Sequence, residues 1–520
     1  MRRKYIDIIS SVGKRANIIN PSLPYNLSNL LKEQNNSQID ASLCYYSSAI
    51  DSSYIKGNDA IIDISEQINN IFPIAVITPG IQYDFDDYEN YLKYLISKNT
   101  KAVLINTTMG LFAYNVPTFD KTFNFCEKHN LPVMFDYSLL GQNVDNLMEI
   151  LMRYENLKVV LYNITWAYSK QIFSYMEQNE NLHVTFPSFQ KTNIIEILCQ
   201  KFGAERLLYS SNYPYTSPGA MKTMIEYANI TEEEKNMISY KNAEKLFSIH
   251  PKLRNFSKQD SEITNSLNKG ESLIKYNIID AHAHLIGDDS ISVNDMCHNV
   301  TGKDIILSMN KIGIKQALFS PMEGIYFDGI SGNQIAMKNT ALYNGSLLAY
   351  ATANPHYKED IDQALRCLEK KHFVGLKLYP MKNLCNYTDE KYERLFEEVI
   401  NQKKIFLCHD SIEGAQSLAS KYRDLKILLA HCAKSFEYAD GAIKLSKEFD
   451  NVYFEISNSK LPYGVLEYLV NEISEDKIVF GTDIGVLNQS STIGYVGYSN
   501  ITDKQKVKVF SKNIKNFIRK

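Results

Sequence analysis

Eight short apolar runs alternate with amphipathic segments through the C-terminal half of the chain. The runs are almost continuous in apolar residues, which is typical of parallel strands covered on both faces. The segments between them, such as residues 389–402, carry apolar residues at helical spacing and charges elsewhere. In order, the runs span residues 277–284, 315–321, 347–354, 374–380, 404–410, 425–432, 451–457 and 477–483. Eight strand–helix pairs of this size predict a (β/α)8 barrel.

The N-terminal half repeats this alternation. Its runs span residues 5–10, 38–46, 73–80, 101–108, 131–137, 157–163, 182–188 and 205–212. The halves also end alike, because residues 228–247 align without a gap with residues 499–518, at an offset of 271. Similarity at a domain-length period indicates a duplicated barrel. We predict an α/β protein with two tandem (β/α)8 TIM-like barrels at residues 1–248 and 276–520, joined by a polar linker at 249–275.

Composition limits the classes of function. The 520 residues carry a net charge of −3, which provides no global field toward nucleic acid or an anionic membrane. The basic N-terminus lacks the apolar stretch of a signal peptide, and no apolar run approaches the ~18 residues of a membrane span. The eight cysteines show no CxxC spacing and read as reduced thiols. We expect a cytoplasmic protein that acts on a small molecule, with its barrels packed on each other and a homo-oligomer as a further option.

Histidines gather at the strand ends of the second half. Seven of the ten follow Asp280, and His282 and His284 form an HxH pair whose side chains point to the same side of the first strand. Further chemistry-bearing residues end the fourth, fifth, sixth and eighth strands: Lys377, His409, His431 and Asp483. Each alone is more often a structural residue, but together they occupy the end of a barrel where catalytic groups lie. Neutral imidazoles and a carboxylate suit a divalent metal such as zinc with an open coordination position, so the pattern predicts a metal site.

The second half resembles the amidohydrolase superfamily, and within it the amidohydrolase 2 branch. The motifs DAHAHL, GLKLYP, FLCHD, LLAHC and FGTD are similar to those of the family in the same order, and NPH at residues 354–356 fits its third strand. The resemblance implies that His282, His284 and Asp483 bind the metal, with His409 as a further ligand. For His431 it implies either a ligand to a second metal or an acid/base group that orients water.

Lys377 marks a division within the family. Its segment is similar to one in dihydroorotase-like members, where the lysine is carboxylated and bridges two metals, whereas many members of the branch carry a similar segment with a single metal. We expect one ion rather than two, with zinc favoured over manganese or iron. Two ions, with Lys377 and His431 as added ligands, stay open.

This resemblance implies a metal-dependent hydrolase of a small polar amide, lactone or ester that uses a metal-activated water, with Asp483 and His431 as catalytic residues. Because the same branch contains decarboxylases and hydratases of small carboxylic acids, a lyase is the first alternative. A non-catalytic binding or scaffold protein is the second. Substrate contacts are expected from Glu455, His298 and His356, with Glu323 as a further candidate; each fits a loop residue or a hydrogen-bond partner of a ligand equally well.

The matching positions of the first half carry no imidazole. Ile9 and Ser11 stand where the HxH pair stands in the second half. Ile105, Asp136, Asn163 and Asn212 replace Lys377, His409, His431 and Asp483. Isoleucine cannot bind a metal, and neutral amides are poor zinc ligands. We therefore predict a metal-free first barrel, kept for packing or, as the less favoured reading, for a polar ligand pocket.

Overall fold

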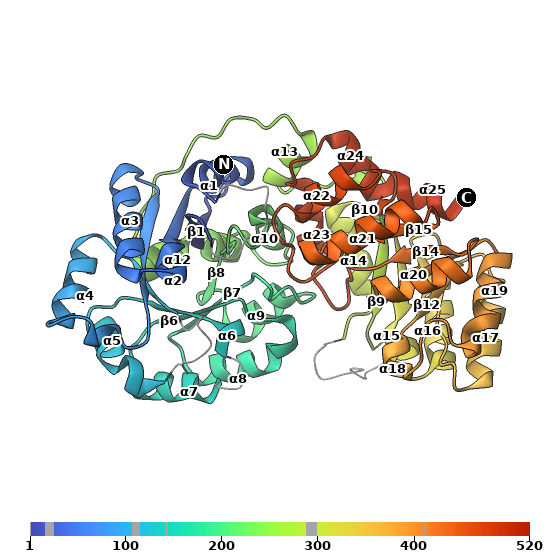
Figure 1. The fold of residues 1–520 in the computed structure, drawn as a ribbon, viewed down its shortest axis with the longest axis horizontal. Coiled ribbons are helices and arrows are strands. Elements are labelled where there is room, and N and C mark those ends of the chain that lie inside the picture. The colour runs from blue at the N-terminus through green and yellow to red at the C-terminus, as the bar shows by residue number, and fades with distance from the viewer. Residues whose placement is uncertain are drawn as a thin grey trace. The chain divides into compact units, whose positions relative to one another are not determined.

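The protein folds into two compact units, residues Met1–Gln259 and Asp260–Lys520. The structure, a computed structural model, describes residues 2–15, 25–106, 115–140, 144–287, 299–409 and 411–519. Each unit holds one eight-stranded parallel sheet whose strands follow chain order, with helices between and around them (Figure 1). The predicted fold class, two tandem (β/α)8 barrels, is confirmed. Within the described ranges, no helix is long and apolar enough to cross a membrane.

Every predicted apolar run overlaps one strand. The strands of the first unit are β1 (Ile6–Val12), β2 (Ala41–Tyr46), β3 (Ile71–Ile77), β4 (Ala102–Ile105), β5 (Val133–Asp136), β6 (Val159–Tyr162), β7 (Leu182–Thr185) and β8 (Leu207–Leu208). Those of the second unit are β9 (Ile278–Leu285), β10 (Ile314–Pro321), β11 (Leu347–Ala351), β12 (Phe373–Leu378), β13 (Ile405–Cys408), β14 (Lys426–Leu429), β15 (Val452–Glu455) and β16 (Ile478–Val479).

Helices connect the strands and cover their outer face. The first unit contains α1 (Leu27–Ser37), α2 (Ser48–Asp51), α3 (Tyr54–Gln67), η1 (Ile81–Tyr83), α4 (Tyr88–Ser97), α5 (Val116–Lys128), α6 (Tyr137–Leu140), α7 (Val144–Arg153), η2 (Trp166–Tyr168), α8 (Ser169–Gln178), α9 (Ile194–Phe202), α10 (Pro218–Glu226), α11 (Glu232–Asn236), η3 (Met237–Lys241) and α12 (Asn242–Phe247). The second contains α13 (Glu262–Asn268), η4 (Ile274–Tyr276), α14 (Gly302–Ile312), α15 (Met322–Tyr326), α16 (Gly329–Leu342), α17 (Lys358–Leu368), α18 (Pro380–Asn383), η5 (Glu390–Tyr392), α19 (Glu393–Asn401), α20 (Ile412–Lys421), α21 (Phe436–Glu448), α22 (Val465–Glu472), α23 (Gln489–Gly497), α24 (Asp503–Val507), η6 (Lys508–Lys512) and α25 (Asn513–Arg519).

Each sheet closes on itself. In the first unit, the Ile8 amide of β1 donates to the Tyr209 carbonyl just after β8, at 3.2 Å. In the second, the Ala281 amide of β9 donates to the Phe480 carbonyl just after β16, at 3.0 Å. Closure removes the free sheet edges and brings the first and last strands side by side. Residues at the ends of β9 and β16 therefore become neighbours although about 200 residues separate them.

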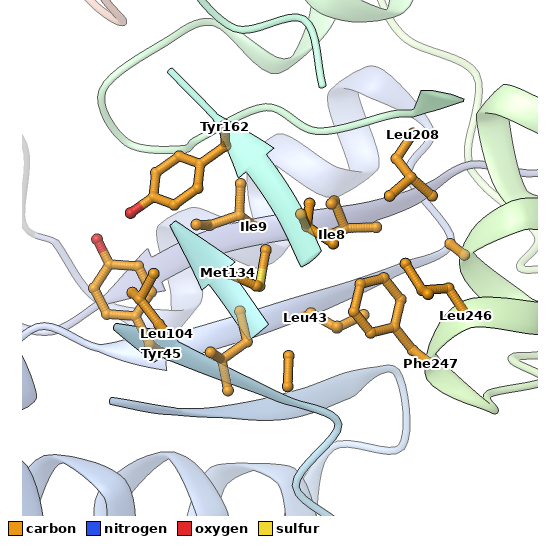
Figure 2. Packing of buried hydrophobic residues seen from close by; sticks show 14 of the residues in the cluster. Ile8, Ile9, Leu43, Tyr45, Leu104, Met134, Tyr162, Leu208, Leu246 and Phe247 are labelled. Carbon is orange, nitrogen blue, oxygen red and sulfur yellow. The ribbon is translucent and has the colours of Figure 1, made fainter. Parts of the chain in front are cut away.

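The amino-terminal end of each barrel is filled by the last helix that follows its final strand, α12 in the first unit and α25 in the second. Leu246 and Phe247 of α12 pack into the first core at the end opposite Tyr45 and Tyr162, which lie near the carboxyl ends of β2 and β6 (Figure 2). Phe517 of α25 belongs to the core of the second barrel in the same way. This packing leaves the carboxyl ends of the strands as the end where a site is built.

The two units repeat local contacts 271 residues apart. Lys235 Nζ donates to the Glu226 carbonyl at 2.8 Å, and Lys506 Nζ donates to the Gly497 carbonyl at 2.8 Å. The helices that carry these lysines both begin with a capping box and continue into a π-helix, η3 in the first unit and η6 in the second. The recurrence of such specific contacts supports the proposal that one half is a copy of the other.

Part of the predicted linker at 249–275 is helical and belongs to the second unit. Helix α13 begins after Ser261, whose side chain caps it by accepting from the Thr264 amide at 3.0 Å. The Thr264 hydroxyl donates to the Gly497 carbonyl of α23 at 2.7 Å. Its apolar residues Ile263 and Leu267 are buried, which explains why so polar a segment still forms an ordered helix.

Candidate metal centre

The barrel places the six predicted strand-end residues at the carboxyl end of the second barrel. His282 and His284 lie on β9 with 0% and 5% of their surface exposed, because alternate residues of this strand face the barrel interior. Lys377 is buried in β12. His409 directly follows β13, and His431 and Asp483 follow β14 and β16.

Hydrogen bonds fix which ring nitrogens of the HxH pair carry the proton. His282 Nδ1 lies 3.1 Å from Glu455 Oε2, and His284 Nδ1 lies 3.1 Å from the Ser320 carbonyl. Glu455 accepts from every other donor around it, including the amides of His431 and Ser457. Burial raises the pKa of Glu455, whereas these donors favour its ionised form. Both histidines therefore donate through Nδ1 and keep a lone pair on Nε2.

Three lone-pair atoms face one another at the centre of the site. His282 Nε2 and His284 Nε2 are 3.1 Å apart, and Asp483 Oδ1 lies 3.1 Å from His284 Nε2 and 3.8 Å from His282 Nε2. Ligands bound at ~2.0–2.1 Å around a tetrahedral ion stand roughly 3.3 Å from one another. The observed separations of 3.1–3.8 Å are close to this value, and with both Nδ1 atoms donating elsewhere the three facing atoms are left as acceptors. This donor set fits a divalent metal ion.

Burial and nearby charge favour the neutral form of His282 and His409, as metal ligation requires. Burial lowers the pKa of His282 well below its ordinary value, and the positive charge of Lys377 lowers it further. The same two causes, in the same order, lower the pKa of His409. A neutral imidazole presents its lone pair without first losing a proton.

His409 and His431 lie beside the three donors. The ring centroids of His282 and His431 are 5.0 Å apart, and those of His409 and His431 are 5.2 Å apart. His431 Nδ1 donates to the Ser457 carbonyl at 2.9 Å, which leaves its Nε2 as an acceptor. His431 also forms a second possible ligand group with His282 and Glu455. The structure therefore brings all four predicted histidines of this end into one cluster.

The predicted substrate-contact residues are placed differently from one another. Glu455 is fully buried and contacts His282 rather than open space. His356 is exposed, and its Nε2 lies 2.7 Å from the Asn383 carbonyl at the end of α18. Glu323 is half-buried at the start of α15, where burial raises its pKa. His298 lies outside the described residues.

Sequence reasoning missed the residues that orient the cluster. Ser320 holds His284, and Ser457 contacts both His431 and Glu455. Asp280, in the DAHAHL motif, accepts from the Thr482 amide at 3.0 Å and from Gln489 Nε2 at 2.9 Å, which ties β9 to the loop that carries Asp483. For Asp280, the position two residues before His282 was the one sequence signal of a role in the site. Ser320 and Ser457 have no such signal in the sequence.

In the first barrel, the side chains at the corresponding positions are hydrogen-bonded to one another, so that no cation is needed between them. Asn212 Nδ2 donates to Asn163 Oδ1 at 2.8 Å, and Asn163 Nδ2 donates to Asp136 Oδ2 at 2.7 Å. Amide protons thus fill the spaces between oxygens. Among the described residues, groups of three possible metal ligands occur in the second barrel.

The backbone at these positions is the same in both barrels. His431 and Asp483 have φ of 65° and 58°, and Asn163 and Asn212 have φ of 54° and 52°. Asparagine tolerates this left-handed conformation better than most residues, so the turn that presents a ligand in one barrel is retained in the other.

The partner of His282 is also exchanged in the first barrel. Thr185 pairs with Leu208 as Glu455 pairs with Val479. Thr185 therefore occupies the position of Glu455, just as Ile9 occupies that of His282. A buried carboxylate without its imidazole partner would be destabilising, which gives a physical reason for losing both together.

A buried carboxyl in the first barrel predicts a pH dependence of stability. Asp7 accepts from the Ser211 hydroxyl and amide at 2.5 and 2.8 Å, and burial raises its pKa to about 7. The folded state then binds more protons than the unfolded state between pH ~4 and ~7, so stability falls as pH rises through this window. In Asp7→Asn, we expect the decrease in the free energy of unfolding between pH 5 and pH 8 to be smaller than in the wild type by about 2–3 kcal/mol.

Urea unfolding at several pH values, followed by the fluorescence of Trp166, checks this prediction, since the single tryptophan of the chain lies in the first unit. Asp120→Asn, at a partly exposed carboxyl, is the matched control, and its stability should change with pH as that of the wild type does. If the stability of Asp7→Asn changed with pH as that of the wild type does, Asp7 would be ionised in the folded state over this range.

Comparisons with known proteins follow the same division of the chain. A family model described as amidohydrolase matches residues 77–249 and 331–519, one segment in each half and together more than half of the chain. No curated protein matches. Similar solved structures include 2,6-dihydroxybenzoate decarboxylase from Rhizobium, with 15% identity, a TM-score of 0.39 and coverage of 47% of this chain and 98% of that chain. An amidohydrolase from Staphylococcus aureus described as putative has 17% identity, a TM-score of 0.38 and coverage of 47% and 100%. 5-Carboxyvanillate decarboxylase from Sphingomonas paucimobilis has 12% identity, a TM-score of 0.36 and coverage of 47% and 99%.

Proposed function

The chain belongs to the amidohydrolase family, and we propose that its C-terminal barrel is a metal-dependent enzyme that hydrolyses a small polar amide, lactone or ester. The observation that carries the proposal is the convergence of His282 Nε2, His284 Nε2 and Asp483 Oδ1, which lie 3.1–3.8 Å from one another. One divalent ion fits this set of three, with zinc as the first expectation and manganese or iron as alternatives.

A divalent ion held there would lower the pKa of a water and polarise a substrate carbonyl. Asp483 is the best-placed acid/base, because its carboxylate lies at the donor cluster and its side chain keeps 13% of its surface exposed. Asp483 would accept the proton of the attacking water and return it to the leaving group. His431, with an acceptor Nε2 beside the cluster, would orient the water or the substrate; His409 would serve as a further ligand.

A lyase is the second candidate, because the buried Lys377 suits a substrate that carries a carboxylate. Its ammonium is buried close enough to His282 and His409 to lower the pKa of both. A buried positive charge beside a metal suits a substrate that carries a carboxylate. Such a carboxylate is either a recognition group in a hydrolase or the group lost by a decarboxylase.

We further propose that the first barrel, residues 1–248, is a copy that has lost metal binding. The hydrogen-bonded chain of Asp136, Asn163 and Asn212 supports this, since its amide protons make a cation unnecessary. The exchange of the His282–Glu455 pair for Ile9 and Thr185 supports it as well.

The test is metal-dependent turnover by the full chain. Protein stripped with a chelator would be reloaded separately with zinc, manganese or iron(II) and offered amides, lactones, esters and aromatic or unsaturated carboxylic acids. We expect reloading to restore hydrolysis at least 10²-fold, and His282→Ala to stay at background. Release of carbon dioxide in place of hydrolysis would replace the first candidate by the second. Turnover that depends neither on added metal nor on His282 would contradict both the hydrolase and the lyase proposals.

A further inference from the structure

Arg15 buries a positive charge at the carboxyl end of the first barrel. It follows β1, the strand that carries Ile9 and Ser11 at the places of the HxH pair. Only 10% of its side chain is exposed, and Nε lies 3.2 Å from Asp51 Oδ2. Among the described residues, neither Nε nor Nη1 has a hydrogen-bond partner of acceptable geometry, although both atoms are buried. The charge of the guanidinium is thus paired with Asp51 and the group also contacts Tyr45, but two of its buried nitrogens have no hydrogen-bond acceptor in the described part of the chain.

Tyrosines hold this guanidinium beside the barrel mouth. The Arg15 guanidinium lies 5.3 Å from the ring centroid of Tyr215 and interacts electrostatically with Tyr45. Tyr45, near the carboxyl end of β2, points its hydroxyl out of the core (Figure 2). That hydroxyl is hydrogen-bonded to Ser11 and interacts electrostatically with Asp136. Arg15 therefore borders the end of the first barrel that corresponds to the metal-donor end of the second barrel.

Buried donors of this kind are costly unless a ligand meets them. An unsatisfied buried donor costs about 1–3 kcal/mol, and more when it is charged. The planar guanidinium fork matches two oxygens of one carboxylate or phosphate. Asn163 and Asn212, at the same end of the barrel, are already hydrogen-bonded to each other and to Asp136. They therefore do not need the positive charge of Arg15.

The second half offers no arginine at this point of the chain. Lys14 and Arg15 follow Gly13 in the first half, whereas Asp288 and Asp289 follow Gly287 in the second. The half with the metal donors carries acidic residues here, and the half without them carries basic ones. We propose that the mouth of the first barrel binds the oxyanion group, a carboxylate or a phosphate, of a small molecule through Arg15. This site is separate from the proposed metal centre and does not depend on it.

Binding of simple probes to the metal-stripped full chain tests the proposal. 4-Fluorobenzoate, followed by fluorine NMR, represents a carboxylate, and inorganic phosphate is added as a competitor. We expect 4-fluorobenzoate or phosphate to bind the wild type, and the dissociation constant to rise at least tenfold in Arg15→Gln. Arg153→Gln, at an exposed arginine of the same barrel, is the matched control and should bind as the wild type does. Arg15→Lys keeps the charge but loses the fork, so we expect intermediate binding.

The outcomes separate the sources and the sites. Binding of 4-fluorobenzoate that phosphate does not displace identifies a carboxylate ligand, and displacement by phosphate identifies a phosphate ligand. Should Arg15→Gln unfold, the Arg15→Lys variant decides, and wild-type affinity there overturns the proposal. Binding lost in His282→Ala but kept in Arg15→Gln would place the ligand in the second barrel and overturn it. Absence of binding by both probes to the folded wild type also overturns it.

Discussion

Replacing His282 by alanine is expected to empty the metal centre. After metal-replete expression and removal of loosely bound ions, the wild type should retain about one equivalent of metal, and His282→Ala and Asp483→Asn less than about a tenth. His282→Ala removes one of three donors that lie 3.1–3.8 Å apart, and Asp483→Asn replaces a carboxylate by a neutral amide, a poor ligand, so two good donors of this set remain. Two protein donors hold a divalent ion far more weakly than three or four. Turnover of whichever substrate the screen identifies should fall at least 10³-fold in both variants.

Elemental analysis of the purified variants measures this directly. His129→Ala is the matched control, since it removes an exposed imidazole of the first barrel and should leave the metal content unchanged. A wild-type ratio near two would favour the two-ion reading with Lys377 as a bridging ligand, and Lys377→Met should then lower the ratio to one or less. Unchanged metal content in both His282→Ala and Asp483→Asn would refute the ligand assignment.

Much of the fold was predictable because parallel strands leave a strong local signal. Each buried strand appears in the sequence as an apolar run, and each of the sixteen predicted runs overlaps a strand. The HxH pair was predictable for the same reason, since strand periodicity alone places both side chains on one face. Helix α13 was not, because its polar sequence becomes a helix through burial of Ile263 and Leu267, a tertiary effect.

The site was predictable as a set of residue types but not as a geometry. The order of His409, His431 and Asp483 along the chain indicates strand ends, whereas their convergence depends on closure of the barrel. Tautomers depend on acceptors that are distant in sequence: Glu455 is 173 residues from His282. The first barrel shows the same limit, since the sequence indicates that Asn163 is a poor ligand but not that its amide bonds to Asp136.

The second large effect is expected at Glu455, a positioning residue that touches His282. Its two oxygens accept from His282 Nδ1, from the His431 amide and from the amide and hydroxyl of Ser457. In Glu455→Gln, one acceptor becomes an amide donor of the same size and faces donors on every side. His282 would then keep its Nδ1 proton without an anionic partner or move it to Nε2, where it blocks metal binding. We expect metal affinity to fall 10- to 100-fold and stability by about 1–3 kcal/mol.

Competition with a chromophoric chelator measures the affinity, and urea unfolding of the stripped protein measures the stability. Glu467→Gln is the matched control, because Glu467 lies on α22 of the same barrel and accepts from the Asn500 amide at 2.7 Å, away from the cluster. We expect it to change stability while leaving metal affinity at the wild-type value. A merely structural role for Glu455 predicts this same pattern. Loss of affinity in Glu455→Gln alone therefore separates orientation of the ligand from support of the fold, and equal affinities in both variants would remove Glu455 from the metal centre.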